Sequence, residues 1–170
     1  DNGAFTKTFD PYKFAAFLEL LKPYRDTCIF VAVPDVLGNC VITRFLWRHW
    51  QPALSHWPLA FVAQDGETDI PDGASAVFIG GSTEWKESAA AVAIIQIAQR
   101  RGLHVHIGRV NWKARYDKFN LLPGSEGFTC DGTRTRFDGR KKTMVAWAGY
   151  QDQPPLFRAD CSVPISDSSG

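Results

Sequence analysis

The chain has 170 residues, enough for one domain with a hydrophobic core, and its 45% hydrophobic and 22% charged residues are ordinary for a soluble globular protein. No apolar run approaches the roughly 20 residues that a transmembrane helix requires, which argues against a membrane protein. The formal net charge is only +1, but residues 1–99 are net acidic and residues 100–170 are net basic. The basic residues gather in 100–118 and 134–142, which fits either a phosphate-binding face or an ordinary solvated helix face.

The start of the chain and its cysteines indicate the cellular compartment. Residues 1–5 provide neither the basic segment nor the apolar segment of a secretory signal peptide. Because the chain also starts without a methionine, we expect it to be a fragment of a longer protein. None of the four cysteines has the CxxC spacing of zinc and redox motifs. Two of them lie in apolar, strand-like contexts, where we expect buried free thiols, and a reducing, cytoplasmic setting fits.

The first half of the chain alternates helix and strand. Apolar residues at helical spacing predict a helix over 11–21, and the continuous apolar, β-branched run at 28–33 predicts a buried strand. A second helix is predicted over 42–54. Two more buried strands are predicted at 59–63 and 76–79, and each is followed by residues typical of turns.

The second half continues the alternation. The range 88–101 predicts a helix, because its small and apolar residues share one face and its last turn is basic. A strand is predicted at 103–107, a short helix at 113–119 and a short strand at 127–130. The range 143–150 fits a helix and a strand equally well.

This alternation of strands that are apolar on both faces predicts an α/β fold with a parallel sheet and outer helices. A closed (β/α) barrel of the TIM type and an open doubly wound sheet both satisfy the pattern. The sequence lacks the GxGxxG and GxxxxGK[ST] motifs of nucleotide-binding open sheets, which favours the barrel. A full barrel usually needs about 250 residues, so we expect a partial or compact one.

We expect a single catalytic domain over residues 1–150. A further strand is expected immediately before Asp1, where the chain begins. Residues 151–170 are rich in Pro, Asp and Ser, which predicts an extended, partly disordered tail.

Polar and glycine-rich groups follow the predicted strands. In a parallel α/β fold the carboxyl ends of all strands lie on one face, and ligands bind there. Each of these groups taken alone could simply form a turn or cap the next helix. Because such groups follow every predicted strand, we predict that together they form one shared site. The candidate site residues are Asp1, Asp35, Gln64, Gly80, Gly81, Glu84, Arg109, Asn111 and Asp131.

The chemistry of these residues suggests individual roles. Gly80 and Gly81 lack side chains, so a flat ligand can approach their backbone closely. A carboxylate and an amide, such as Asp35 and Gln64, present the acceptors and donors that match the edge of a purine-like ring.

The carboxylates Asp1 and Asp131 are suited to divide the work of nucleophile and general acid/base, and paired carboxylates also serve glycosidic bond cleavage. His104 and His106 alternate along one strand and therefore point to the same side. With Glu84 and Asp131 they offer an alternative, a metal-dependent or retaining hydrolase. A histidine pair whose hydrogen bonds are satisfied within the fold is the simpler interpretation.

In their order along the chain, these motifs resemble the tRNA-guanine transglycosylase superfamily. The resemblance is closest to its phage and bacterial DpdA-like members, which insert 7-deazaguanines into DNA, and it spans roughly residues 1–133. It is carried by Asp1-Asn2-Gly3-Ala4-Phe5, Val33-Pro34-Asp35, Gln64-Asp65-Gly66, Gly80-Gly81-Ser82-Thr83-Glu84-Trp85 and Asp131-Gly132-Thr133.

The resemblance implies a (β/α) barrel that exchanges guanine for a 7-deazaguanine, such as a preQ0-like base, by a covalent ping-pong route without a cofactor. It implies that Asp131 is the nucleophile that attacks the sugar C1′ and that Asp1 shuttles a proton to the base. It also implies that Asp35 and Gln64 read the edge of the base, above a floor formed by the Gly-Gly backbone.

Differences from the family pattern indicate whether DNA or tRNA is the acceptor of the base. The tRNA enzymes carry a Cys-x-Cys-x-x-Cys…His zinc site after the nucleophile strand, whereas only Cys161 lies beyond Cys130 here. We therefore expect no metal, and DNA rather than tRNA as the acceptor. From its charge, Arg109 is expected to hold backbone phosphate. A non-catalytic nucleic-acid-binding module, a homo-oligomer and base stacking by Trp85 or Trp112 stay open.

Overall fold

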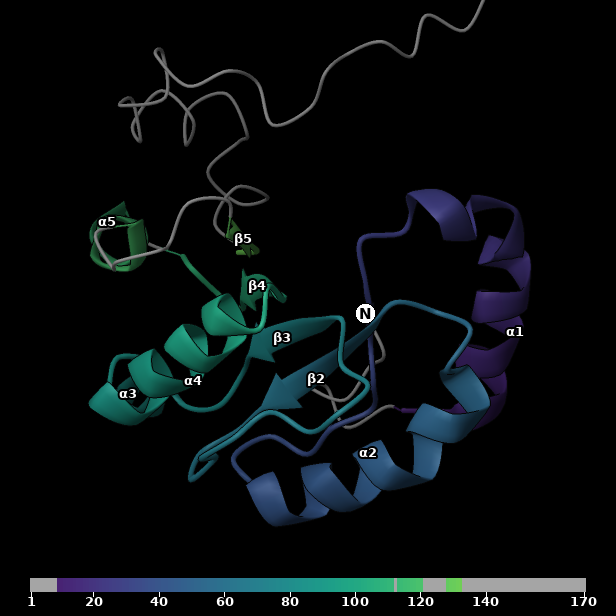
Figure 1. Ribbon diagram of the computed structural model, residues 1–170, viewed down its shortest axis with the longest axis horizontal. Coiled ribbons are helices and arrows are strands. Elements are labelled where there is room, and N and C mark those ends of the chain that lie inside the picture. Colours follow the sequence, from purple (N-terminus) through teal and green to yellow (C-terminus); the bar gives the residue numbers. More distant parts are fainter. Residues whose placement is uncertain (1–8, 112, 121–127, 133–170) are drawn as a thin grey trace, which may run out of the picture. The chain divides into compact units, whose positions relative to one another are not determined.

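A computed structural model describes residues 9–111, 113–120 and 128–132 (Figure 1). The chain separates into two compact units, residues 1–132 and 133–170, and every described residue belongs to the first. Asp1, the undecided range 143–150 and the expected tail at 151–170 lie outside the described residues.

The described strands form one five-stranded sheet, which is parallel throughout and follows the chain order β1-β2-β3-β4-β5. The sheet curls as half of a barrel would, so the α/β prediction is confirmed, while the described part of the chain does not make a complete TIM barrel. The strands are β1 Val31–Ala32, β2 Leu59–Ala63, β3 Ala76–Ile79, β4 His104–Ile107 and β5 Thr129–Cys130.

The helices connect these strands, with one 3-10 helix after the first of them. They are α1 Pro11–Leu21, η1 Lys22–Thr27, α2 Cys40–Leu54, α3 Thr83–Lys86, α4 Ala89–Arg100 and α5 Lys113–Asn120. Three predictions need correction. Only residues 31–32 of the predicted strand 28–33 pair with a neighbour, α2 begins two residues earlier than predicted, and α3 was not predicted at all.

Polar side chains fix where three of these helices begin. The carboxylate of Asp10 accepts hydrogen bonds from the backbone N–H of Tyr12 and Lys13 at 2.9 and 3.2 Å. Asn39 caps α2 in the same way and thereby sets its earlier start, and Ser88 caps α4. Each such cap satisfies an N–H group that the helix leaves unpaired and typically stabilises the fold by about 1 kcal/mol.

One face of the sheet is covered by helices and forms the hydrophobic core. α2 packs against β2, and α4 packs against β3 and β4. The Trp47 ring meets Phe61 edge-on at 5.5 Å, and Phe61 and Ile94 have no exposed surface. Burial of such side chains stabilises the fold by about 1.5–3 kcal/mol each.

The opposite face of the sheet carries aromatic rings and histidines. Phe78, His106 and Thr129 are register partners on adjacent strands, so their side chains share this face. The ring centroid of His106 lies 4.5 Å from that of Phe78 and 5.2 Å from that of Phe30. The predicted orientation of His106 and His104 to one side is confirmed, because both contact Thr129.

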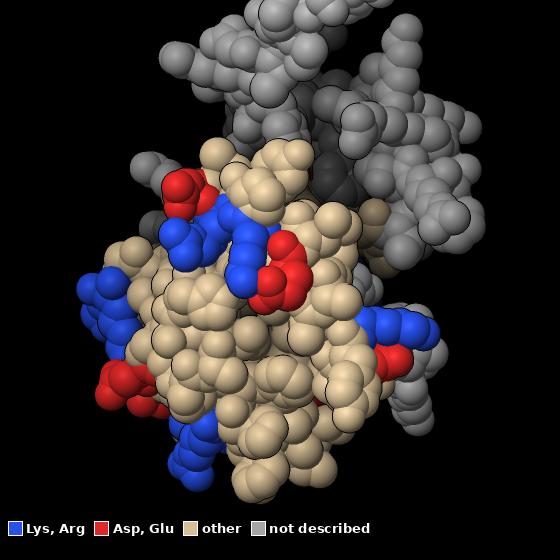
Figure 2. All heavy atoms as spheres, turned by 90° about the vertical axis from the view of Figure 1, so that its right-hand side faces the viewer, with Lys and Arg blue, Asp and Glu red and all other residues tan. Residues whose placement is uncertain are grey.

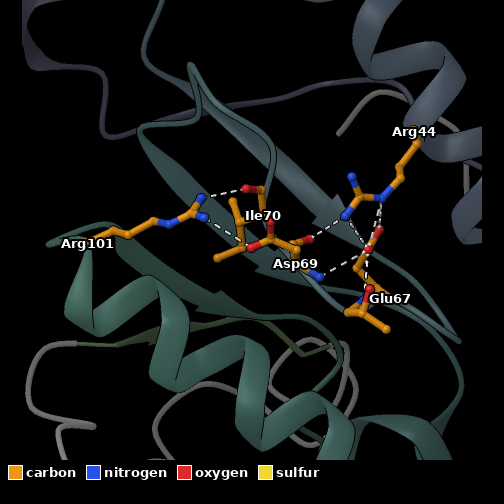
Figure 3. Close-up of polar contacts among 6 residues, drawn as sticks. Arg44, Glu67, Asp69, Ile70 and Arg101 are labelled. Carbon is orange, nitrogen blue, oxygen red and sulfur yellow. Dashed lines mark hydrogen bonds and ion pairs between the residues drawn. The ribbon is translucent and has the colours of Figure 1, made fainter.

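The crossover from β2 to β3 contains no helix and is held instead by two arginines (Figure 3). Arg44 of α2 binds Glu67, with 2.6 Å between Nη2 and Oε1, and also donates to the backbone carbonyl of Asp69. Arg101, directly after α4, donates to the carbonyl of Ile70 at 2.5 Å and pairs with the Asp69 carboxylate at 3.0 Å. Glu67 and Ile70 are buried, so this loop takes the place of a covering helix.

On the side of the described unit that carries α1, separate patches of charged side chains stand around a broad surface of other residues (Figure 2). Large apolar side chains of α1 and η1 are exposed, among them Tyr12, Leu20 and Tyr24. The described helices include none that is both long enough and apolar enough to cross a membrane.

Candidate active site

The carboxyl ends of the five strands are joined by hydrogen bonds that run from Asp35 to Asp131. The amide nitrogen Nε2 of Gln64 donates to Oδ2 of Asp35 at 2.7 Å, and its Oε1 accepts from the backbone N–H of Gly81 at 2.9 Å. Arg109 donates from its guanidinium to the carbonyl of Gly81 and from its backbone N–H to Oδ1 of Asp131 at 2.5 Å. We call these five residues the strand-end network.

Gln64 is a deeply buried member of the network, with 1% of its surface exposed. Its Oε1 also accepts from the N–H of Gly38 at 2.8 Å, so both lone pairs of this oxygen are used. Gln64 therefore ties the loops after β1 and β3 to its own strand. Its predicted contact with a base would have to use the nitrogen side of the amide, next to Asp35.

The two glycines after β3 lie in tight backbone packing. A Cβ on Gly80 would come within 2.7 Å of Nε2 of Gln64. Gly81 has φ of +68°, and a Cβ there would approach Oδ2 of Asp65 to 2.6 Å and the Trp85 ring to 2.7 Å. Packing alone thus requires glycine at both positions, whether or not a ligand approaches them.

Asp65 holds Ser82, the residue that caps the short helix α3 by accepting from the backbone N–H of Trp85. Its two carboxylate oxygens accept from the N–H and hydroxyl of Ser82 at 2.8 and 2.6 Å. Burial raises the pKa of Asp65, but these hydrogen bonds and the charge of Arg109 outweigh burial and lower that pKa below its usual value. Asp65 is therefore an ionised structural carboxylate beside the network.

Asp131 is a half-exposed carboxylate directly after β5. Its side chain is 53% exposed, and its Oδ2 lies 3.5 Å from Nε2 of His106. Burial raises its pKa, but hydrogen bonds from His106 and from the Arg109 N–H, with the charges of His106 and Lys86, lower it overall. The adjacent Cys130 thiol has its pKa raised to about 11 by burial and by Asp131, so the thiol is protonated at neutral pH and the carboxylate is the charged group at this strand end.

Lys86 lies behind the network and was not predicted from the sequence. It has no exposed surface, and its Nζ donates to the carbonyl of Gly108 at 2.7 Å. Burial, together with the charges of Arg109 and Arg115, lowers its pKa to about 8. α3 has only four residues, so no periodicity distinguished an inward-facing lysine from the exposed Glu84 two positions earlier.

The remaining predicted residues fall in different places. Glu84 is exposed on α3 and is not one of the five residues of the network. Asn111 lies in the loop after β4, where its Oδ1 would be 2.9 Å from a Cβ on Gly132. Trp85 is buried against Gly81, and its Nε1 finds no hydrogen-bond partner among the described residues, so it packs in the core rather than at a stacking surface. Trp112 lies outside the described residues.

The basic region at 100–118 is largely neutralised within the fold. Arg115 and Lys118 of α5 both pair with Glu87 at 3.0 Å, which lowers the pKa of Glu87, mainly through the hydrogen bonds from Lys118 and Arg115. Arg101 is used by the β2–β3 loop. For these residues of 100–118, the interpretation as an ordinary solvated helix face therefore fits better than the interpretation as a phosphate-binding face.

The histidines and cysteines do not assemble a metal site in the described part of the chain, where no group of three or more His, Cys, Asp or Glu side chains is placed to hold an ion. His104 and His106 both bond Thr129 instead, as the simpler interpretation required. Cys28, Cys40 and Cys130 are free thiols and half-buried, so the expectation of a buried thiol in a strand-like context is wrong for Cys28 and Cys130.

Comparison with protein-family models, with curated protein sequences and with solved structures finds no match to this chain.

Proposed function

We propose that the chain is the catalytic part of a base-exchange transglycosylase, which replaces guanine by a 7-deazaguanine in DNA through a covalent aspartate intermediate. The half-barrel would belong to a partial or compact (β/α) barrel of the TIM type, with the reaction at the carboxyl ends of its strands. Nucleic acid and the free base are the implied partners, and no cofactor is needed.

The observation that carries this proposal is the strand-end network itself. The motifs were predicted to share one site although they lie up to 96 positions apart, from Asp35 to Asp131. Asp35 contacts Gln64 directly, and Gly81 and Arg109 complete the connection to Asp131. A carboxylate–amide pair at one end and a carboxylate nucleophile at the other match the two tasks of base recognition and covalent catalysis.

The two oxygens of Asp131 are held differently, which suits one of them to attack. Oδ1 is fixed by the short hydrogen bond from the Arg109 N–H, whereas Oδ2, among the described residues, has only the 3.5 Å contact with His106. In the proposed reaction Oδ2 bonds to C1′ of the sugar as the bond from C1′ to the guanine nitrogen breaks. The electron pair of that bond leaves with guanine, which takes up a proton. An incoming 7-deazaguanine then loses a proton, attacks C1′ and releases the carboxylate.

Recognition of the base falls to Asp35 and to the nitrogen side of Gln64, because the amide oxygen of Gln64 is saturated. A carboxylate acceptor next to an N–H donor matches the adjacent donor and acceptor groups of a guanine edge. The roles of Asp1 as proton shuttle and of Arg109 as phosphate ligand remain predictions from the resemblance and from charge.

The test is an exchange assay with the 170-residue chain and, in parallel, with any longer protein of which this chain is a part. Labelled guanine or preQ0 is incubated with DNA or with tRNA, and incorporation of the label is measured. We expect label in DNA with the wild type and none with Asp131→Asn. The exposed Asp26→Asn variant is the matched control and should incorporate label as the wild type does. Equal incorporation by Asp131→Asn would remove the proposed nucleophile.

A further inference from the structure

Four side chains on the aromatic face of the sheet form one continuous hydrogen-bonded chain. Nε2 of His104 and Nδ1 of His106 each lie 2.8 Å from the hydroxyl oxygen of Thr129. The other ring nitrogen of His106, Nε2, faces Oδ2 of Asp131 at 3.5 Å. Adjacent strands β4 and β5 hold this order, because His106 and Thr129 are register partners.

The single hydroxyl proton of Thr129 fixes the direction of this chain. A carboxylate only accepts, so neutral His106 keeps its proton on Nε2 and its Nδ1 accepts from the Thr129 hydroxyl. The hydroxyl oxygen then accepts from Nε2–H of His104. Both neutral histidines are therefore Nε2–H tautomers. If His106 carries a second proton on Nδ1, the hydroxyl must turn towards His104, which then holds its own proton on Nδ1.

We propose that His104, Thr129 and His106 form a proton relay that adjusts the charge beside Asp131 during catalysis; this inference rests on the proposed function. A proton taken from water by Nδ1 of His104 displaces the proton on Nε2 to the Thr129 oxygen. The original hydroxyl proton passes to Nδ1 of His106. One proton enters, one arrives at His106, and the hydroxyl is re-formed.

The relay runs in reverse when Asp131 reacts. Formation of the ester with C1′ removes the negative charge of Asp131, so the imidazolium of His106 loses its counter-charge. Its Nδ1 proton returns to Thr129, and His104 releases a proton to water. When the incoming base restores the carboxylate, the uptake steps repeat. His104, Thr129 and His106 are thus positioning residues, because only Asp131 touches the reacting carbon.

The surroundings of the rings favour transfer along this path. Phe30 and Phe78 pack against them and carry no charge. The charged groups near this end of β4 and β5 are Asp131 itself, with Lys86 and Arg109 beyond it. Burial, with a smaller effect of His106, lowers the pKa of His104, so His104 passes protons on without retaining a charge.

The relay is tested on the resting protein by long-range ¹H–¹⁵N NMR of the imidazole rings, titrated from pH 8 to pH 5. In the wild type we expect His104 to change from the Nε2–H to the Nδ1–H tautomer as His106 gains its proton. The near-isosteric Thr129→Val variant should lose this coupling, and Thr129→Ser, which keeps a hydroxyl, should retain it. An unchanged His104 tautomer in the wild type would overturn the relay even if Thr129→Val fails to fold.

Base exchange separates failure of the relay from failure of the proposed function. With Thr129→Val we expect a rate reduced at least about tenfold and an altered pH profile, as for loss of assisted proton transfer. A Thr129→Val variant that exchanges base at the wild-type rate and with the wild-type pH profile contradicts the relay and leaves the function intact. If NMR shows that the His104 tautomer changes together with the protonation of His106, but no form of the protein exchanges base, the proton path exists and its role in base exchange is contradicted.

Discussion

The backbone N–H of Arg109 donates a 2.5 Å hydrogen bond to Oδ1 of Asp131, from the loop after β4 to the end of β5. Arg109 reaches this geometry with φ of 58°, a left-handed conformation that costs a residue with a side chain roughly 1–2 kcal/mol. The hydrogen bond from Lys86 to the Gly108 carbonyl holds the preceding peptide in place. The orientation of the proposed nucleophile thus depends on a strained turn that a buried lysine supports.

Lys86 should make the folded state more stable as the pH rises. Its folded pKa of about 8 lies below the unfolded value of 10.5, so between these values the unfolded chain binds more protons and stability increases with pH. The full change is on the order of 3 kcal/mol. Urea unfolding from pH 7 to pH 10.5 measures it, as the difference between the wild type and Lys86→Met.

The comparison with Lys86→Met is needed because Cys130, with its pKa raised to about 11, changes stability in the opposite direction above its unfolded pKa of 9.0. Lys13→Met, at a lysine whose side chain is 87% exposed, is the matched control and should follow the wild-type pH dependence. A wild-type curve parallel to that of Lys86→Met across this range would contradict a buried, charged lysine.

Replacing Gln64 by glutamate should place two carboxylates in contact. The atom now donating to Asp35 at 2.7 Å would become an acceptor, so the pair must share a proton in the folded state. The folded state then binds more protons than the unfolded one, and stability should fall as the pH rises from about 5 to 8. Thermal unfolding of Gln64→Glu, with the exposed Gln96→Glu as control, measures the effect. Identical pH dependence of the two variants would contradict the contact.

Two acidic residues of the β2–β3 loop should differ sharply in their effect on stability. Glu67 is 2% exposed and accepts from Arg44 and from the loop backbone, so Glu67→Gln should cost about 3–5 kcal/mol of unfolding free energy. The Asp69 side chain is 54% exposed in its pair with Arg101, and Asp69→Asn should cost about 0–1 kcal/mol. Urea denaturation of both variants gives the comparison, and equal losses would show that the buried pair does not anchor the loop.

Asp131 should contribute to stability above acid pH. Burial raises its pKa, but the hydrogen bonds from His106 and Arg109 lower it overall from the usual 3.8, so its stabilisation is present above that value and is lost as the pH falls through the folded pKa. The difference in unfolding free energy between the wild type and Asp131→Asn should therefore be positive at pH 7 and shrink towards pH 3. A constant difference would contradict the hydrogen bonds assigned to the carboxylate.

The parallel sheet could be predicted from the sequence because its strands are apolar on both faces and flanked by turn residues, as at 59–63 and 76–79. The shared location of Asp35, Gln64 and Asp131 followed from the rule that parallel strands end on one side of a sheet. Both arguments use local residue types and need no knowledge of contacts between distant residues.

The features that were missed depend on such contacts. Lys86 and Glu67 are charged residues that the fold buries, and composition assigns such residues to the surface. The strand at 28–33 was predicted too long, because only residues 31–32 have register partners in β2, Val33 adds one hydrogen bond to Ala60, and Ile29 is 62% exposed. The hydrogen bonds that Oε1 of Gln64 accepts from Gly38 and Gly81 could not be foreseen from sequence spacing, since these glycines lie in loops 26 and 17 residues away from Gln64.

The most direct test of the account is to look for the covalent intermediate. The chain is incubated with a guanine-containing DNA oligonucleotide, denatured during turnover and digested, and the peptides are analysed by mass spectrometry. The account predicts a base-free nucleotide esterified to Asp131 in the wild type and no such adduct in Asp131→Asn. Base exchange that proceeds with the adduct on another residue would contradict it.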